Sequence, residues 1–182
     1  MTNLFLAPAS NEGRGLREED SKPYKNLQRG VINQFKTDQY GNIPGDYGKK
    51  VGVWGVTENA KGSWKKLCRG DYILFYTAGS TDHFEYAAEV LGWKNDVTLS
   101  RELFPNWNEG HPSERYTGKI YRYLIFLDDH IETRLNKYQI REHLGYESGK
   151  IDKFCRVGST SKEKVIQEFG SVENFIEDFS VK

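Results

Sequence analysis

Two apolar segments, VGVWGVT (51–57) and DYILFYTA (71–78), constrain the fold of this chain more than any other feature of its sequence. Both are rich in β-branched and aromatic residues, which favour strands. The second segment is apolar on both faces, so a strand formed there must be covered on both sides. We therefore expect buried strands, in a sheet that is either packed between other layers or curled on itself.

Three further segments complete the predicted sheet. NLFLAP (3–8) is a short apolar run ended by proline, and FEYAAEVLGW (84–93) and KIYRYLIFLDD (119–129) also have the composition of strands. The polar loop between the second and third strands predicts a hairpin. The interval 94–118 is longer than compact domains usually allow for a loop, and long loops tend to carry function.

Helical spacing of apolar residues marks the rest of the chain. It occurs over 23–36, over 136–144 with Gly145 as the stop, and over 161–179, where Gly170 and Ser171 divide two helices. The whole pattern predicts one α+β domain over 1–182, with a small twisted or closed β-barrel flanked by helices. Its parts are a β core at about 3–10 and 51–130, a helical insertion at about 20–36 and C-terminal helices at about 136–180.

Composition excludes several classes of protein. The 182 residues include 26 basic and 26 acidic side chains, which excludes a broadly basic nucleic-acid binder but not a local basic patch. There is no apolar run of about 18 residues and no signal-peptide pattern, so we expect a cytoplasmic protein with no membrane contact. Cys68 and Cys155 stand alone in the sequence, which indicates reduced thiols and neither a metal site nor a disulfide.

No motif for catalysis or cofactor binding stands out. GYESGKID (145–152) resembles a phosphate-binding loop but is one residue short and lacks the following Ser or Thr. Asp128, Asp129 and His130 are the nearest approach to an acid–base cluster, but adjacent residues of a strand point to opposite faces. We therefore predict a binding protein without catalytic residues or cofactor, and an enzyme is the least favoured class.

The tryptophans are the strongest candidates for a binding site. Trp54 lies in mid-strand between small residues, Gly52-Val53 and Gly55, which would leave room for a planar guest beside the ring; a buried core position is the open alternative. Trp93 ends a predicted strand, and Trp107 lies in the long loop. Aromatic rings that converge from a strand and a loop can form a cage for a base or a methylated nitrogen.

Basic residues gather near these aromatic residues in the sequence. A cation cluster would hold the phosphates of a nucleic acid, although a solvated surface is the common alternative. The candidates for backbone contacts are Lys61, Lys65, Lys66, Arg69, Arg115 and Lys119.

The order of the central segments resembles a known family. Gly52-Val53-Trp54, then Tyr72 to Phe75, then His83 to Val90, preceded by Leu4 to Asn11, is similar to the YTH/EVE branch of the PUA-like superfamily. The resemblance covers roughly 3–10 and 51–130. The insertion and the C-terminal helices are foreign to the RNA readers of this branch, and they are similar to the N-terminal DNA-sensing domain of McrB-type modification-dependent restriction systems.

This resemblance implies a PUA-like barrel and a non-enzymatic reader of modified DNA. Such a reader flips a methylated base, with N6-methyladenine favoured, into an aromatic cage. Trp54 would be the wall from the strand, and Trp107 or else Trp93 the opposing wall. Ser10 and Asn11 would contact the edge of the base. Gly55 replaces the Ser or Cys of the family, so only its backbone could make the family's contact there.

The resemblance also implies partners. These are modified double-stranded DNA, an AAA+ GTPase motor in the same native chain and a nuclease subunit. Two alternatives remain open at this point. One is a reader of N6-methyladenine in RNA, which the effect of the 2′-hydroxyl would distinguish. The other is a partner-binding or small-molecule-binding module on the same fold, in which Trp54 belongs to the core.

Overall fold

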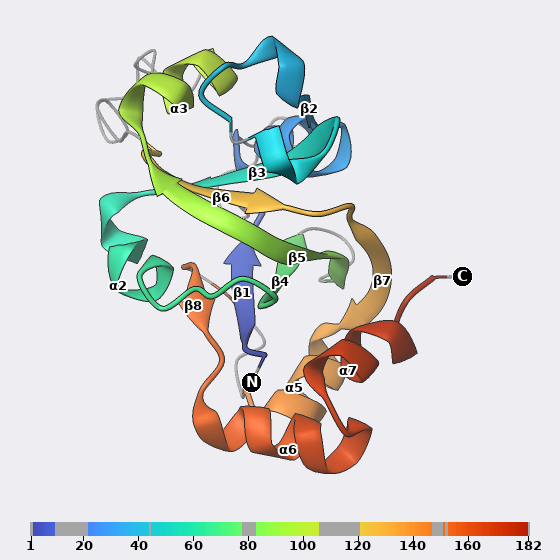
Figure 1. The fold of residues 1–182 in the computed structure, drawn as a ribbon. Coiled ribbons are helices and arrows are strands. Elements are labelled where there is room, and N and C mark those ends of the chain that lie inside the picture. Colours follow the sequence, from blue (N-terminus) through green and yellow to red (C-terminus); the bar gives the residue numbers. More distant parts are fainter. Residues whose placement is uncertain are drawn as a thin grey trace.

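The computed structural model describes residues 2–9, 22–43, 45–77, 83–105, 121–146, 151 and 153–181. Its centre is an eight-stranded sheet in the order β2-β3-β6-β5-β4-β1-β8, in which β7 pairs with β5 (Figure 1). β1 runs parallel to β4, and the other pairs are antiparallel. The strands are β1 (Leu4–Pro8), β2 (Phe35–Lys36), β3 (Lys50–Val56), β4 (Tyr72–Thr77), β5 (His83–Asn95), β6 (Tyr123–Leu127), β7 (Ile131–Asn136) and β8 (Cys155–Arg156).

Helices cover both ends of this sheet. In Figure 1, α3 lies at one end near β2, while α5, α6 and α7 lie together at the other end. The α-helices are α1 (Lys22–Asn26), α2 (Lys61–Trp64), α3 (Val97–Leu103), α5 (Lys137–Leu144), α6 (Ser159–Phe169) and α7 (Val172–Asp178). α1 continues into a π-helix, η2 (Leu27–Ile32), and 3₁₀ turns occupy η3 (Thr37–Gln39), η4 (Gly45–Tyr47) and η5 (Glu58–Ala60).

The sheet is strongly curled. Trp54 on β3 and Phe75 on β4 have ring centroids 5.1 Å apart, although β6 and β5 separate these strands in the sheet. β5 makes this curvature possible, because its pairing shifts register between Val90 and Gly92 and such bulges bend a strand. The α+β class is confirmed. In the described part of the chain the sheet ends at β2 and β8, so its closure into a barrel is not confirmed.

Among the described residues, three apolar clusters form the core. The inner cluster fills the curled sheet and includes Phe5, Trp54 and Phe75. A second cluster lies between β3, β6 and α3, around Phe104 and Phe126. The third packs the C-terminal helices on β1, β4 and β5, with Phe175 at its centre. β3 and β6 thus contribute residues to two clusters, as their nearly continuous apolar sequences predict.

The C-terminal helices follow the prediction closely. α5 begins with a capping box between Asn136 and Gln139 and ends at Gly145, whose φ of 69° is left-handed. α6 and α7 are separated at Gly170, also with positive φ, and Ser171 caps α7 by accepting from the Asn174 amide. These local signals are visible in the sequence, which is why both boundaries are confirmed.

The N-terminal helix departs from the prediction at its end. The helical pattern over 23–36 stops at Ile32, and Phe35 instead pairs with Val51 as the start of β2. The break occurs at Gln34, whose φ of 55° cannot continue a helix. β7 was not among the predicted strands, although the alternation of Ile131, Thr133 and Leu135 in its sequence is typical of one. The long interval 94–118 contains α3.

Candidate functional site

Trp54 lies at the centre of β3, inside the curled sheet. Its side chain is 4% exposed, and the Phe75 ring meets it edge-on at an interplanar angle of 68°. Leu27 and Val31 of η2 belong to the same cluster. The ring is therefore packed in this structure, and a planar guest could stack on it only if one of the surrounding groups moved.

The glycines beside Trp54 serve a different purpose from the one their sequence indicates. A Cβ atom on Gly52 would lie 3.0 Å from Cβ of Leu127, and a Cβ on Gly55 would lie 3.0 Å from Cβ of Tyr121. These glycines let β3 approach β6 and the residues before it closely. The space they leave is already filled by protein, and it is not a void beside the tryptophan ring.

Trp93 shares a row of the sheet with Trp54. Both residues pair with Ile125 of β6, so the three side chains lie on one face with Ile125 between the tryptophans. Trp93 is 38% exposed, whereas Ile125 is fully buried. This arrangement places the two rings side by side along the sheet and not face to face.

The other predicted contacts to the base lie outside the described residues, as do two of the predicted backbone contacts. They are Trp107, Ser10, Asn11, Arg115 and Lys119. Their neighbours in the chain are described. The Ala9 amide donates to the Tyr76 carbonyl at 2.8 Å, and Ala9 belongs to the inner cluster with Trp54. Phe104, beyond α3, packs edge-on against Phe35 at 5.6 Å.

A helix packs closely against β3 next to Trp54. η2 packs against β3, and a Cβ atom on Gly30 would lie 2.2 Å from the carbonyl oxygen of Val53. Only glycine permits this approach. Asn26, where α1 passes into η2, is 1% exposed, and neither atom of its amide has a hydrogen-bond partner within the described residues. Sequence reasoning missed Asn26, because an Asn in a helical pattern is typical of a solvated face.

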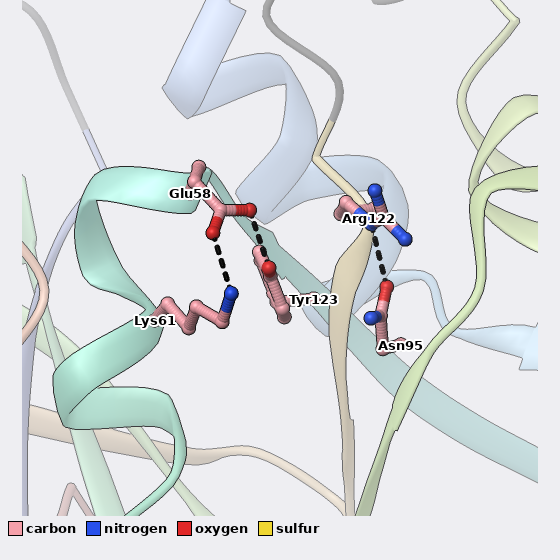
Figure 2. Close-up of polar contacts among 5 residues, drawn as sticks. All are labelled: Glu58, Lys61, Asn95, Arg122 and Tyr123. Carbon is pink, nitrogen blue, oxygen red and sulfur yellow. Dashed lines mark hydrogen bonds and ion pairs between the residues drawn. The ribbon is translucent and has the colours of Figure 1, made fainter.

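A polar cluster lies where β3 ends and β6 begins (Figure 2). The Tyr123 hydroxyl donates to the Glu58 carboxylate, which also pairs with Lys61 at 2.8 Å. The hydrogen bond from Lys61, and then that from Tyr123, lower the pKa of Glu58. The same bond to Glu58 raises the pKa of Lys61. Lys61 is therefore charged, but Glu58 balances its charge.

Further contacts hold the same region together. The Trp64 indole donates to the Leu124 carbonyl at 3.1 Å, and its ring lies 5.0 Å from that of Tyr123. In Figure 2, Arg122 turns away from Glu58 toward Asn95, to which its Nε donates at 2.7 Å. At the start of α3, the hydrogen bond from the Leu99 amide lowers the pKa of the capping Asp96 carboxyl.

The remaining predicted cations of this region lie after α2. Lys65, Lys66 and Arg69 are exposed, and they form no ion pair with any residue that the structure describes. The cluster of cations expected from the sequence thus divides into two kinds. Lys61 has an acidic partner. The other three side chains can bind an external anion without first breaking an ion pair with a described residue.

No metal-binding arrangement occurs among the described residues. They contain no group of His, Cys, Asp and Glu side chains placed to hold a metal ion. Cys68 and Cys155 are free, and burial raises the pKa of the Cys155 thiol, which keeps it protonated. Asp128 and Asp129 lie exposed in the turn after β6. None of the helices described here is both long and apolar enough to cross a membrane.

Comparison with known proteins finds similarity in structure alone. No protein-family model and no curated protein matches the sequence. The chain is similar to the N-terminal domain of McrB from Thermococcus gammatolerans, solved bound to m5C DNA, at 16% identity, with a TM-score of 0.60 and coverage of 93% of this chain and 98% of that one. Human THYN1 in complex with DNA containing 5-methylcytosine matches at 12% identity, TM-score 0.46, over 92% and 97% of the chains. An ASCH protein from Zymomonas mobilis matches at 11% identity, TM-score 0.46, over 91% and 94%.

Proposed function

We propose that this chain, which shares its fold with the N-terminal domain of a McrB protein, is an EVE-like, PUA-like domain and a non-enzymatic reader of modified DNA. It would take a methylated base out of the duplex and stack it on Trp54. The observation that carries this proposal is the shared fold, which extends over 93% of the chain and 98% of a domain solved with methylated DNA.

Base flipping fits the buried position of Trp54. A base inside a duplex cannot reach a ring that is 4% exposed in the interior of a curled sheet. Extruding the nucleotide costs a few kcal/mol. Stacking on an aromatic ring returns about 1–3 kcal/mol per base, and hydrogen bonds to the base edge supply the rest. The residues packed over Trp54 would have to make way for the guest.

The second wall of the cage is proposed from the segment after α3. Trp93 lies in the same row as Trp54, with Ile125 between them, so a base could not be sandwiched by these two rings without displacing Ile125. We therefore favour Trp107 as the opposing wall. Ser10 and Asn11, which follow Ala9 in the sequence, are proposed to contact the base edge, together with the backbone at Gly55.

Two methylated bases are candidates for the guest. The resemblance to the YTH branch favours N6-methyladenine, whereas the structure from T. gammatolerans contains 5-methylcytosine. Either base offers a flat ring for stacking and a methyl group for an apolar wall. We keep N6-methyladenine as the first choice from the sequence and 5-methylcytosine as its direct competitor in the binding test.

The phosphates are proposed to contact the turn after α2. Lys65, Lys66 and Arg69 are exposed and have no acidic partner among the described residues. Arg115 and Lys119, which lie outside the described residues, are proposed to contact phosphates as well. Lys61 would contribute less, because Glu58 already balances its charge. With no net charge on the whole chain, we expect weak nonspecific binding and an affinity concentrated in the pocket.

In a McrB-type system a domain of this kind selects the DNA and other components act on it. We propose the same division here. An AAA+ GTPase motor, in the same native chain, and a nuclease subunit would supply the cleavage, and this domain would supply the recognition.

Substitution of Trp54 tests the proposal. Trp54→Leu keeps an apolar side chain in the core but removes the large flat ring. We expect it to abolish the preference for a modified duplex while residual, salt-dependent DNA binding survives. Binding isotherms at one stated salt concentration measure both quantities. The matched control is Trp64→Leu, which removes a partly buried tryptophan at the margin of the inner cluster, where its indole donates to the Leu124 carbonyl.

The burial of Trp54 also favours a second reading, in which the domain binds a protein or small molecule and Trp54 belongs only to the core. The two readings differ in a measurable way. If Trp54→Leu discriminates modified from unmodified DNA as well as the wild type does, the aromatic cage is excluded and this second reading gains support.

A further inference from the structure

Asn26 presents a buried amide with nothing to bind in this structure. Its side chain is 1% exposed, and neither Oδ1 nor Nδ2 has a hydrogen-bond partner in the described part of the chain. A carboxamide carries two N–H donors and an acceptor oxygen, and buried groups of this kind are almost always paired. The two donors and the acceptor of Asn26 are therefore available to a bound polar group.

The amide lies beside β3, the strand that carries Trp54. A methyl group placed on Gly30 would lie 2.2 Å from the Val53 carbonyl oxygen and 3.3 Å from both Asn26 Oδ1 and Cζ of Phe104. Val53 immediately precedes Trp54 in β3. Phe104 leads into the segment that contains Trp107. Asn26 Oδ1 therefore lies close to the strand that carries Trp54, where η2 packs tightly against it.

The backbone around Asn26 is unusual as well. η2 is a π-helix of six residues, and π-helices are rare and occur mostly at functional sites. Gln34, after the end of η2, has a left-handed φ of 55°, and its buried Nε2 also lacks a partner among the described residues. Strain of this kind is maintained only where the surrounding structure fixes it, and it gathers at ligand sites.

We infer that the Asn26 carboxamide reads the edge of the flipped base. Oδ1 accepts a hydrogen bond from the exocyclic amino group, and Nδ2 donates to the neighbouring ring nitrogen. N6-methyladenine and 5-methylcytosine both present this donor–acceptor pair, and a bidentate amide is suited to it. The inference rests on the proposed function and deepens it, because it names the residue that makes the pocket specific for an amino-bearing base.

The test replaces Asn26 with leucine, which has nearly the same shape and no polar atom. The protein is the full chain, and the probes are one fluorescent duplex prepared unmodified, with N6-methyladenine and with 5-methylcytosine. We expect Asn26→Leu to lose about tenfold or more in affinity for the preferred duplex, with binding to the unmodified duplex unchanged. Its melting temperature should equal or exceed that of the wild type, because an unpaired buried amide is removed.

A matched control lies at the other end of the same π-helix. Asn33 is exposed and follows η2, so Asn33→Leu makes the same chemical change outside the pocket and should leave the preference intact. Asn26→Ala is the second variant if leucine does not fit. A preference of wild-type size in a folded Asn26 variant overturns the inference, and a lowered melting temperature with the preference retained would show a structural role alone.

The design separates this inference from the proposed function. If the wild type prefers a modified duplex and Trp54→Leu loses that preference while Asn26→Leu keeps it, the proposed function survives and the role of Asn26 is excluded. If the wild type itself shows no preference among the three duplexes, the proposed function fails and the inference fails with it.

Discussion

At the C-terminal end of the chain, α5 starts with a reciprocal capping box and ends at a left-handed glycine, whereas α1 passes into a π-helix with no side-chain cap at Asn26. The polar side chains of the two regions also differ in whether they have partners. His143 lies among three phenylalanine rings and pairs with Glu168 at 2.8 Å. Asn26, by contrast, is buried without a partner within the described residues.

This contrast indicates that the C-terminal helices stabilise the fold, whereas the segment from Asn26 to Gln34 keeps features that cost stability. α5 and α7, each with a side-chain cap at its start, pack with α6 against the sheet at one end. The helix against β3 breaks several local rules at once, in its hydrogen-bonding pattern, its left-handed Gln34 and its unpaired amides. Local rules are broken mostly where function requires it, and here the break lies beside Trp54.

The largest expected loss of stability comes from a substitution in the C-terminal helices. Phe175 is fully buried, with ring centroids 5.1 Å from Phe169 and 5.4 Å from Phe179. Phe175→Ala should lower the free energy of unfolding by about 3–5 kcal/mol, because a large cavity replaces the ring. Chemical denaturation measures the loss. The preference of the remaining folded protein for modified DNA should stay that of the wild type, and a change in that preference would show that the two regions are coupled.

A smaller loss of stability is expected from a substitution of Gly30, in the π-helix η2 that packs against β3. Gly30→Ala brings a methyl group within 2.2 Å of the Val53 carbonyl oxygen, so η2 must move away from β3. We expect a loss of about 1–3 kcal/mol in stability, as for other overpacked sites. DNA preference should fall as well, because η2 carries residues of the cluster around Trp54.

Gly62 provides the control for Gly30. It also lies in a helix, but a Cβ atom there would meet nothing within 4 Å. Gly62→Ala should therefore stabilise the protein by up to about 1 kcal/mol, as alanine normally does in a helix. If both alanine variants behaved alike, the close approach of η2 to β3 would not matter for folding.

The smallest loss of stability is expected when the cap of α5 is removed. Asn136 accepts hydrogen bonds from the amides of Tyr138 and Gln139. Asn136→Ala should cost about 1 kcal/mol of stability and leave DNA preference untouched. Thermal unfolding followed by circular dichroism measures the shift. A loss of preference in this variant would mean that the C-terminal helices take part in recognition.

The sequence predicted those parts of the fold that depend on local signals. The strands around Trp54 and Phe75 are rich in β-branched and aromatic residues, and the ends of α5 and α6 carry recognisable stop signals. The end of the N-terminal helix was predicted wrongly, because Gln34 adopts a left-handed conformation and Phe35 after it pairs with Val51 of β3. No residue in that segment signals it.

The candidate site was predictable only in part. The position of Trp54 between small residues in an apolar strand indicated a candidate site. Its burial could not be predicted, because it depends on how far the sheet curls. The role of Gly52 and Gly55 depends on side chains of distant segments, Leu127 and Tyr121. Asn26 could not be identified at all, since an amide is unpaired only when the whole surrounding structure fails to provide a partner.

The most direct test of the central claim is equilibrium binding of the wild-type chain to one fluorescent duplex. The duplex is prepared unmodified, with N6-methyladenine and with 5-methylcytosine, alongside the matching methylated RNA, at one salt concentration. A preference of about tenfold or more, equal to about 1.4 kcal/mol, for one modified DNA is the predicted result. Equal binding to all four would contradict the account and leave Trp54 as a residue of the core.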